Sequence, residues 1–108
     1  MSRTEPELLK DALLHLDFID RYATMDLGQD VVVDAIALRL ASMIDALNGL
    51  PSVLLEDLFG QDWPAMRGLR NRIAHGYHLV AADVLRVTVT QELPAVRESL
   101  ERRLSDIG

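Results

Sequence analysis

The stretch VVVDAIALRLASMIDALNGL, residues 31–50, decides the fold class because it is apolar around much of the circumference of a helix. One polar line runs along it near helical spacing, formed by Asp34, Ser42, Asp45 and Asn48. A helix with so broad an apolar surface is buried on more than one side. In a chain of 108 residues, such a helix lies at the centre of a bundle or at a subunit interface, so we expect a homodimer.

Helical spacing is also present on both sides of this stretch. Thr4 is suited to cap a first helix, whose apolar residues recur every three or four positions as far as Ala23. Gly28 lies at or beyond the end of that helix. The run SVLLEDLF (52–59) predicts a short helix before a turn at Gly60.

Two further helices are expected in the second half of the chain. Asp62 is a candidate N-cap for a helix that Gly76 follows as its C′ residue. The final segment is mixed, because LRVTVTQ (85–91) is β-branched and alternates as in a strand, whereas the residues from Pro94 onwards have helical spacing. With no second strand-like run to pair with it, we favour a helix that is kinked or broken near Pro94. The sequence therefore predicts an all-α, up-and-down bundle of four long helices and one short helix.

Composition limits the possible functions. The chain, residues 1–108, is expected to form one domain, and it has no cysteine, which excludes disulfides and thiolate-bound metals. The N-terminus lacks the pattern of a signal peptide, and no uncharged apolar run is long enough to span a bilayer, so we expect a cytoplasmic protein without membrane association. The net charge of −6 argues against wrapping nucleic acid by bulk electrostatics. Any contact with RNA must be local or supplied by a partner.

One local excess of positive charge stands out. Ten of the eleven basic residues are arginine, and Arg67, Arg70 and Arg72 fall within six positions. Guanidinium groups bind phosphate bidentately, so these residues can form a small phosphate-facing patch. For Arg67 and Arg72, solvated side chains near a helix C-terminus are an equally good interpretation.

Residues 68–78, GLRNRIAHGYH, place three polar groups suited to RNA cleavage at the end of a predicted helix. Asn71 and His75 are four positions apart and share a face, whereas Arg70 and His75 lie about 140° apart on an ideal helix. Histidine transfers protons near neutral pH, and an adjacent arginine stabilises the charge that forms when a ribose 2′-OH attacks its own phosphodiester. Such chemistry requires neither a metal nor a cofactor. The spacing alone is weak, because a helix-end histidine is usually structural.

The chain resembles the HepT-like group of the HEPN superfamily over most of its length. The likeness runs through DALLHLDFIDRYA (11–23), DWPAMRGLRNRIAHGYHLV (62–80) and VTVTQELPAVRESLERRL (87–104). Its most specific part is a tryptophan followed by Met-Arg and then R-N-x3-H-x-Y. These last positions are Arg70, Asn71, His75 and Tyr77.

That resemblance implies a dimeric helical ribonuclease, the toxin of a HepT–MntA type VII toxin–antitoxin system, which cuts RNA such as tRNA or mRNA. Arg70 and His75 are then catalytic, and Asn71 supports them. An MntA-like nucleotidyltransferase antitoxin is the implied partner, and it neutralises the toxin by adenylylation of Tyr77. Where the group often carries glutamate, this chain has Asp45, one methylene shorter, which argues against a role that requires the acid to reach the site.

Three other interpretations remain open at this stage. In the first, the domain is a non-catalytic nucleotide-binding or scaffold partner of a nucleotidyltransferase, and Arg70 and Asn71 bind a nucleotide phosphate. Alternatively, it is a structural acidic dimer in which His75 only caps a helix end. A metal site at His75 and His78 is disfavoured, because the spacing fixes no third ligand.

Overall fold

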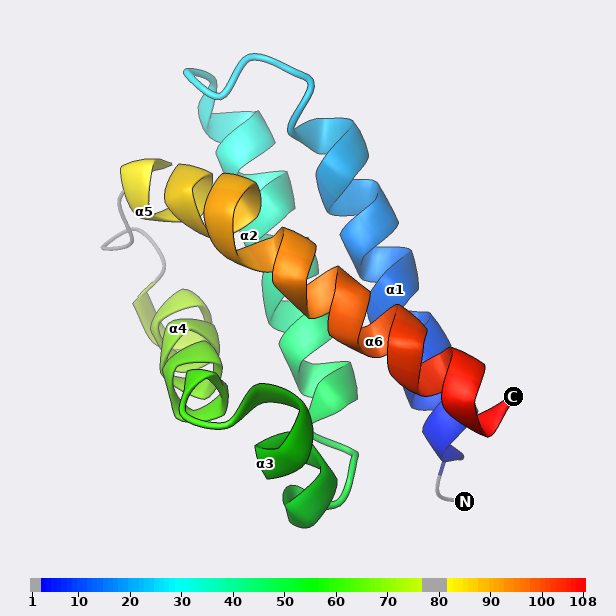
Figure 1. Cartoon of the computed structure of the whole chain (residues 1–108). Helices are drawn as coiled ribbons and strands as arrows, with labels where there is room; N and C mark the ends of the chain where they lie inside the picture. Colours follow the sequence, from blue (N-terminus) through cyan, green and yellow to red (C-terminus); the bar gives the residue numbers. More distant parts are fainter. Residues whose placement is uncertain (1–2, 77–81) are drawn as a thin grey trace.

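The computed structural model describes residues 3–76 and 82–108 of the chain. In these ranges it contains helices and turns and no β-strand. The helices, in chain order, are α1 (Glu5–Tyr22), α2 (Asp30–Leu47), α3 (Ser52–Phe59), α4 (Asp62–Gly76), α5 (Ala82–Val87), the π-helix η2 (Thr88–Glu92) and α6 (Leu93–Ile107). α1 and α2 lie side by side in opposite directions, and α6 crosses in front of them (Figure 1). The predicted all-α bundle is confirmed. None of the described helices is both long and apolar enough to cross a membrane.

α1 begins where its capping sequence places it. The hydroxyl of Thr4 accepts a hydrogen bond from the Glu7 backbone N–H at 3.3 Å and donates one to the Glu7 carboxylate at 2.9 Å. This reciprocal arrangement satisfies an N–H group that the first turn of a helix leaves without a partner. The predicted cap is therefore confirmed.

α2 is the central helix of the bundle, as its broad apolar surface predicts. It packs against α1, α4 and α5. Eight of its side chains are buried: Val32, Ile36, Ala37, Leu40, Met43, Ile44, Ala46 and Leu47. Val31 and Leu38 on the same helix remain exposed. The expected homodimer stays a prediction.

The turn into α4 depends on Gly60, whose φ of +54° and ψ of −129° suit glycine best. The N–H of Trp63 donates to the Gly60 carbonyl at 3.3 Å and tightens the first turn. α4 therefore begins at Asp62 itself, so this residue lies in the first turn and the predicted boundary is one position late. Gly76 is the last residue of the helix, where a C′ position beyond its end was predicted.

A π-helix interrupts the regular α-helical pattern just before Pro94, where the sequence predicted a helix that is kinked or broken. The N–H of Leu93 donates to the carbonyl of Thr88, five residues earlier, which is the π-helical pattern. Proline causes this locally, because it has no N–H and its ring collides with the carbonyl four residues before it. The hydroxyl groups of Thr88 and Thr90 donate to main-chain carbonyls four residues back, at 2.9 and 2.8 Å. These bonds give the carbonyls of Val84 and Arg86 a side-chain partner.

The π-helix also brings the core residues of this helical segment onto one face. Leu85, Leu93 and Leu100 are all buried. Leu93 and Leu100 are seven apart and differ by about 20° around an ideal helix, whereas Leu85 and Leu93 are eight apart and differ by about 80°. A π-helical turn absorbs one extra residue, so all three leucines face the core.

Candidate functional site

The side chain of Arg70 is held by Asp45 across the contact between α4 and α2. Nε of Arg70 donates to Oδ1 of Asp45 at 2.6 Å, and Nη2 donates to Oδ2 at 3.3 Å. This is the bidentate geometry that matches guanidinium to carboxylate. The shorter acid does reach the site, so the expectation that it would not was wrong. The hydrogen bond that Arg70 donates to Asp45 and the negative charge of Asp45 both raise the pKa of Arg70.

Asp45 fixes the direction of the guanidinium without covering it. A guanidinium carries five N–H donors, and Asp45 engages two of them, which leaves three for a ligand. The side chains of Arg70 and Asp45 are 33% and 53% exposed, so solvent screens the pair and its contribution to stability is small. Its effect is to orient Arg70. Sequence reasoning missed this role because pairing requires the register between two helices.

An open polar pocket of about 210 Å³ lies at this contact. α2 contributes Ile44 and Asp45 to its wall together with its C-cap residue Asn48, and α4 contributes Arg67, Arg70 and Asn71. The structure therefore brings the predicted residues Arg70 and Asn71 together. It places Arg67 of the predicted phosphate-facing patch in the same wall, whereas Arg72 does not line the pocket, and it adds Asn48.

His75 lies apart from this pocket within one chain. It is exposed in the last turn of α4, about 140° around the helix and about 7.5 Å along it from Arg70. Asn71 lies between the two on the helix surface, since it is 40° from His75 in an ideal helix, or about one turn away. Among the described residues no hydrogen bond joins Asn71 to His75. The chain therefore presents Arg70 and His75 on one helix but not in one cleft.

Two of the residues named from the sequence cannot be placed. Tyr77 and His78 lie outside the described residues. Within the ranges 3–76 and 82–108, no group of three or more His, Cys, Asp or Glu side chains is arranged to hold a metal ion.

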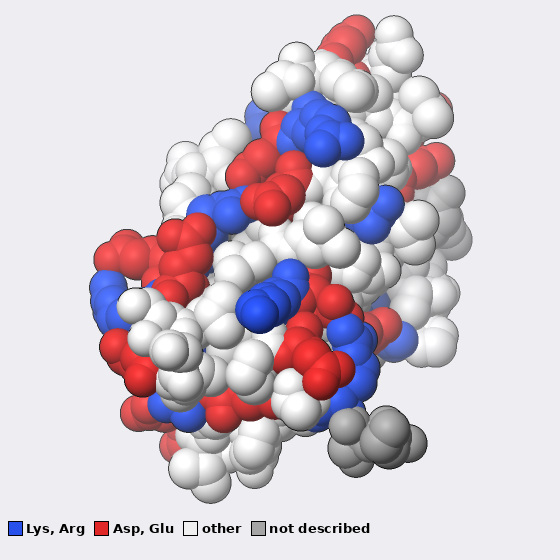
Figure 2. Space-filling view, turned by 90° about the vertical axis from the view of Figure 1, so that its right-hand side faces the viewer, with Lys and Arg blue, Asp and Glu red and all other residues white. Residues whose placement is uncertain are grey.

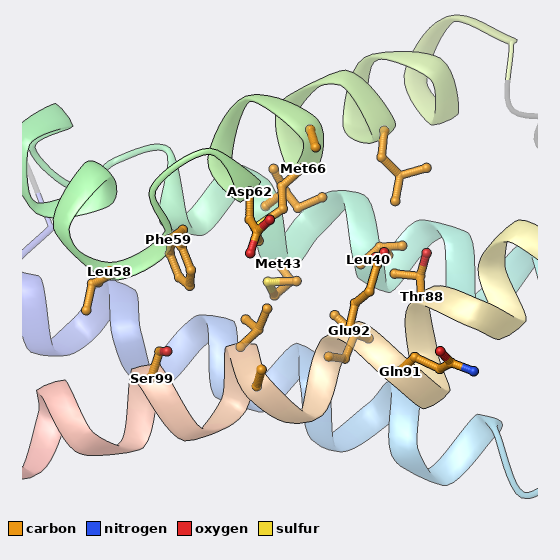
Figure 3. Close-up of a pocket in the computed structure, with 16 residues that line it drawn as sticks. Leu40, Met43, Leu58, Phe59, Asp62, Met66, Thr88, Gln91, Glu92 and Ser99 are labelled. Carbon is orange, nitrogen blue, oxygen red and sulfur yellow. The ribbon is translucent and has the colours of Figure 1, made fainter.

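A second cavity, of about 310 Å³, has different chemistry (Figure 3). It is a groove between α4 and the η2–α6 segment, with α2 as its floor, and its interior is formed by apolar side chains such as Met43 and Phe59. Asp62 and Glu92 project towards it from opposite sides. Its wall contains no arginine, lysine or histidine. Two carboxylates and no cation make the groove unsuitable for a phosphate, so size alone does not identify the site.

The charges elsewhere on the molecule are largely paired. On the face shown in Figure 2, basic and acidic residues lie side by side. Arg97 of α6 pairs with Asp17 and Asp20 of α1 at 3.0 and 2.8 Å, and Arg103 pairs with Glu5 at 2.5 Å. These pairs compensate the positive charges of Arg97 and Arg103.

Arg67 and Arg72 on α4 differ from these residues. In the part of the chain that the structure describes, neither has a carboxylate within ion-pair distance. Only Arg67 of the two lines the polar pocket. Arg21 of α1 and Arg39 of α2 also have no ion pair among the described residues, but their guanidinium groups lie over the ring of Phe18.

A family model described as ribonuclease HepT-like matches residues 9–103, which include α2, α4 and the polar pocket between them. No curated protein and no solved structure matches the chain.

Proposed function

The chain belongs to the HepT-like ribonuclease family, and we propose that it is an RNA-cutting toxin, a metal-independent endoribonuclease that acts on tRNA or mRNA. Arg70 and His75 are its catalytic residues, and Asn71 supports them. The observation that carries the proposal is the orientation of Arg70 by Asp45 at an open polar pocket. An arginine fixed in this way, with donors left free, is suited to stabilise charge on a reacting phosphate.

The proposed reaction needs only the substrate's own nucleophile. His75 accepts the proton of a ribose 2′-OH, and the oxygen attacks the adjacent phosphorus. The P–O5′ bond breaks, the 5′ oxygen leaves with a proton from water, and the other product carries a 2′,3′-cyclic phosphate. Arg70 stabilises the additional negative charge on the phosphorus centre.

The separation of Arg70 from His75 supports a dimeric site. Within one chain the two side chains point about 140° apart, so one phosphate does not contact both without a second copy or a large rearrangement. We propose that a homodimer places Arg70 of one subunit near His75 of the other. This arrangement follows from the helix geometry and from the family to which the chain belongs.

We propose that a nucleotidyltransferase antitoxin of the MntA type switches the toxin off at Tyr77. The phenol oxygen attacks the α-phosphorus of ATP, pyrophosphate leaves, and AMP remains on the tyrosine. The added phosphate lies two residues from His75, where its charge and bulk compete with an RNA phosphate.

The first test is cleavage of total tRNA and of mRNA by the purified protein in excess chelator, with wild type compared with His75→Ala. We expect cutting that resists the chelator, leaves cyclic phosphate ends and falls by at least about a hundredfold in the variant. The intact mass of the wild type shows beforehand that Tyr77 is unmodified.

His75→Ala cutting at the wild-type rate would remove this site. Absence of cutting by the unmodified wild type, with retained binding of a nucleotide, would favour the non-catalytic partner of a nucleotidyltransferase.

The second test is Tyr77→Phe with the cognate nucleotidyltransferase and ATP. We expect the variant to cut RNA and to escape neutralisation, because phenylalanine has no oxygen to adenylylate. Intact mass measures the AMP increments, and equal increments on wild type and variant would contradict the assignment of Tyr77.

A further inference from the structure

The polar pocket contains one positive charge that its own residues do not balance. Arg70 and Asp45 form a pair that is neutral overall. Arg67 is exposed and lines the same pocket, and no carboxylate in the described part of the chain lies within ion-pair distance of it. In a protein with a net charge of −6, this residue supplies the pocket's net attraction for an anion.

The position of Arg67 relates it to the reaction centre. It precedes Arg70 by one helical turn and therefore lies about 4.5 Å along the helix from it. Around the helix axis its direction falls between those of Arg70 and His75, but along the axis it lies on the side of Arg70 away from His75. A nucleic-acid strand bound at Arg70 that continues along α4 away from His75 therefore passes Arg67.

Amide side chains complete the wall around this arginine. Asn48 from the end of α2 and Asn71 from α4 line the pocket, and both are exposed. Each side-chain amide offers two N–H donors. Two amides and a free guanidinium are donors that RNA phosphate oxygens accept from.

We infer that Arg67 and Asn48 form a phosphate-binding subsite for the RNA backbone, next to the phosphate that is cut. The inference rests on the proposed ribonuclease function. The subsite binds substrate equally well before and during reaction, so it lowers KM and leaves kcat unchanged. The pocket's volume of about 210 Å³ is below the usual 300 Å³ or more of a pocket for a whole small-molecule ligand, which fits a single phosphate group.

The test compares Arg67→Ala with Arg72→Ala on a labelled oligoribonucleotide. Arg72 is the matched control, because it is an exposed arginine of the same helix without an ion pair in the described residues and lies outside the pocket. We expect Arg67→Ala to raise KM about tenfold with kcat within about twofold. The slope of log KM against log salt falls by about 0.7, the value for one phosphate contact on a single strand. Arg72→Ala leaves both quantities near wild type.

A second pair of variants tests the subsite independently. Asn48→Asp places a negative charge beside the phosphate and should raise KM more than Asn48→Ala does. Thermal melting of each variant shows that the fold is intact.

Equal effects of Arg67→Ala and Arg72→Ala on KM would overturn the inference, because they would show general attraction only. A fall in kcat at unchanged KM would also overturn it, since Arg67 would then act on the reacting phosphate. Binding of a non-cleavable 2′-O-methyl oligonucleotide separates this inference from the proposed function. If the wild type cuts nothing but Arg67→Ala alone weakens that binding, the subsite stands and the ribonuclease proposal fails.

Discussion

α2 and α4 pack against each other, but they differ in how many side chains they bury and in the polar groups they expose. α2 buries eight side chains, whereas α4 buries only Ile73. α4 instead carries exposed polar groups, including His75 and Asn71. Its remaining apolar contacts, such as Leu69, are only half-buried.

The difference separates stability from chemistry. α2 holds the bundle together through close-packed apolar contacts. α4 is anchored by few such contacts, which leaves most of its surface for a ligand, and the Asp45–Arg70 pair orients an arginine on that surface. A helix that serves as a binding surface cannot also bury that surface.

The largest expected effect tests where the stability lies. Leu47→Ala on α2 removes a fully buried side chain and should lower the free energy of unfolding by about 2–5 kcal/mol. Leu69→Ala on α4 removes the same atoms from a half-buried position and should cost about half as much or less. Urea unfolding followed by circular dichroism measures both. Equal losses of unfolding free energy would show that the two helices do not differ in their contribution to stability.

The next effect tests the contact that joins them. Asp45→Ala frees the guanidinium of Arg70 to rotate, so kcat for RNA cleavage should fall about tenfold. Asp34→Ala is the matched control, because it removes an exposed carboxylate from the same helix that has no ion pair among the described residues. We expect its kcat to stay near wild type.

Both rates are measured at saturating RNA with unfolding curves alongside. A higher kcat in Asp45→Ala would show that the carboxylate masks Arg70 instead of orienting it.

The smallest expected effects are the changes in stability when one glycine in α4 and one just after α2 are replaced by alanine. Gly68 lies inside α4, and a methyl group there would meet no atom within 4 Å. Gly68→Ala should therefore stabilise the protein by about 0.5–1 kcal/mol through helix propensity. A methyl group at Gly49, just after α2, would lie 3.0 Å from a Leu8 methyl carbon, so Gly49→Ala should not stabilise.

Melting temperatures check this pair. Destabilisation by Gly68→Ala would show that the space above α4 is filled, and loss of cleavage with raised stability would show that RNA or a second copy approaches there closely.

The fold could be predicted almost completely from the spacing of apolar residues. The apolar composition of α2 predicts its central position, and Thr4 predicts the start of α1. The predicted start of α4 was one residue late, because the tight turn at Gly60 lets the helix begin one residue earlier. Local sequence indicates such a turn but does not fix where the first helical bond forms.

The site was predictable only in part. Arg70 and Asn71 could be chosen from the sequence, and they do share a pocket. Their partners Asp45 and Asn48 lie more than twenty positions earlier, and their contact depends on how α3 and its turns set α4 against α2. That register arises from tertiary packing, which residue spacing within one helix does not determine.

The π-helix before Pro94 has a consequence for sequence comparison. Because it absorbs one residue between Leu85 and Leu93, it is a one-residue insertion that the helix keeps without turning its core face outwards. A relative without this insertion should be one residue shorter between these leucines and should have no proline at the position of Pro94. We expect the length of the segment between Leu85 and Leu93 and the presence of the proline to change together among relatives. An alignment gap within residues 85–93 would then mark a change from π-helix to α-helix, with the buried leucines still aligned.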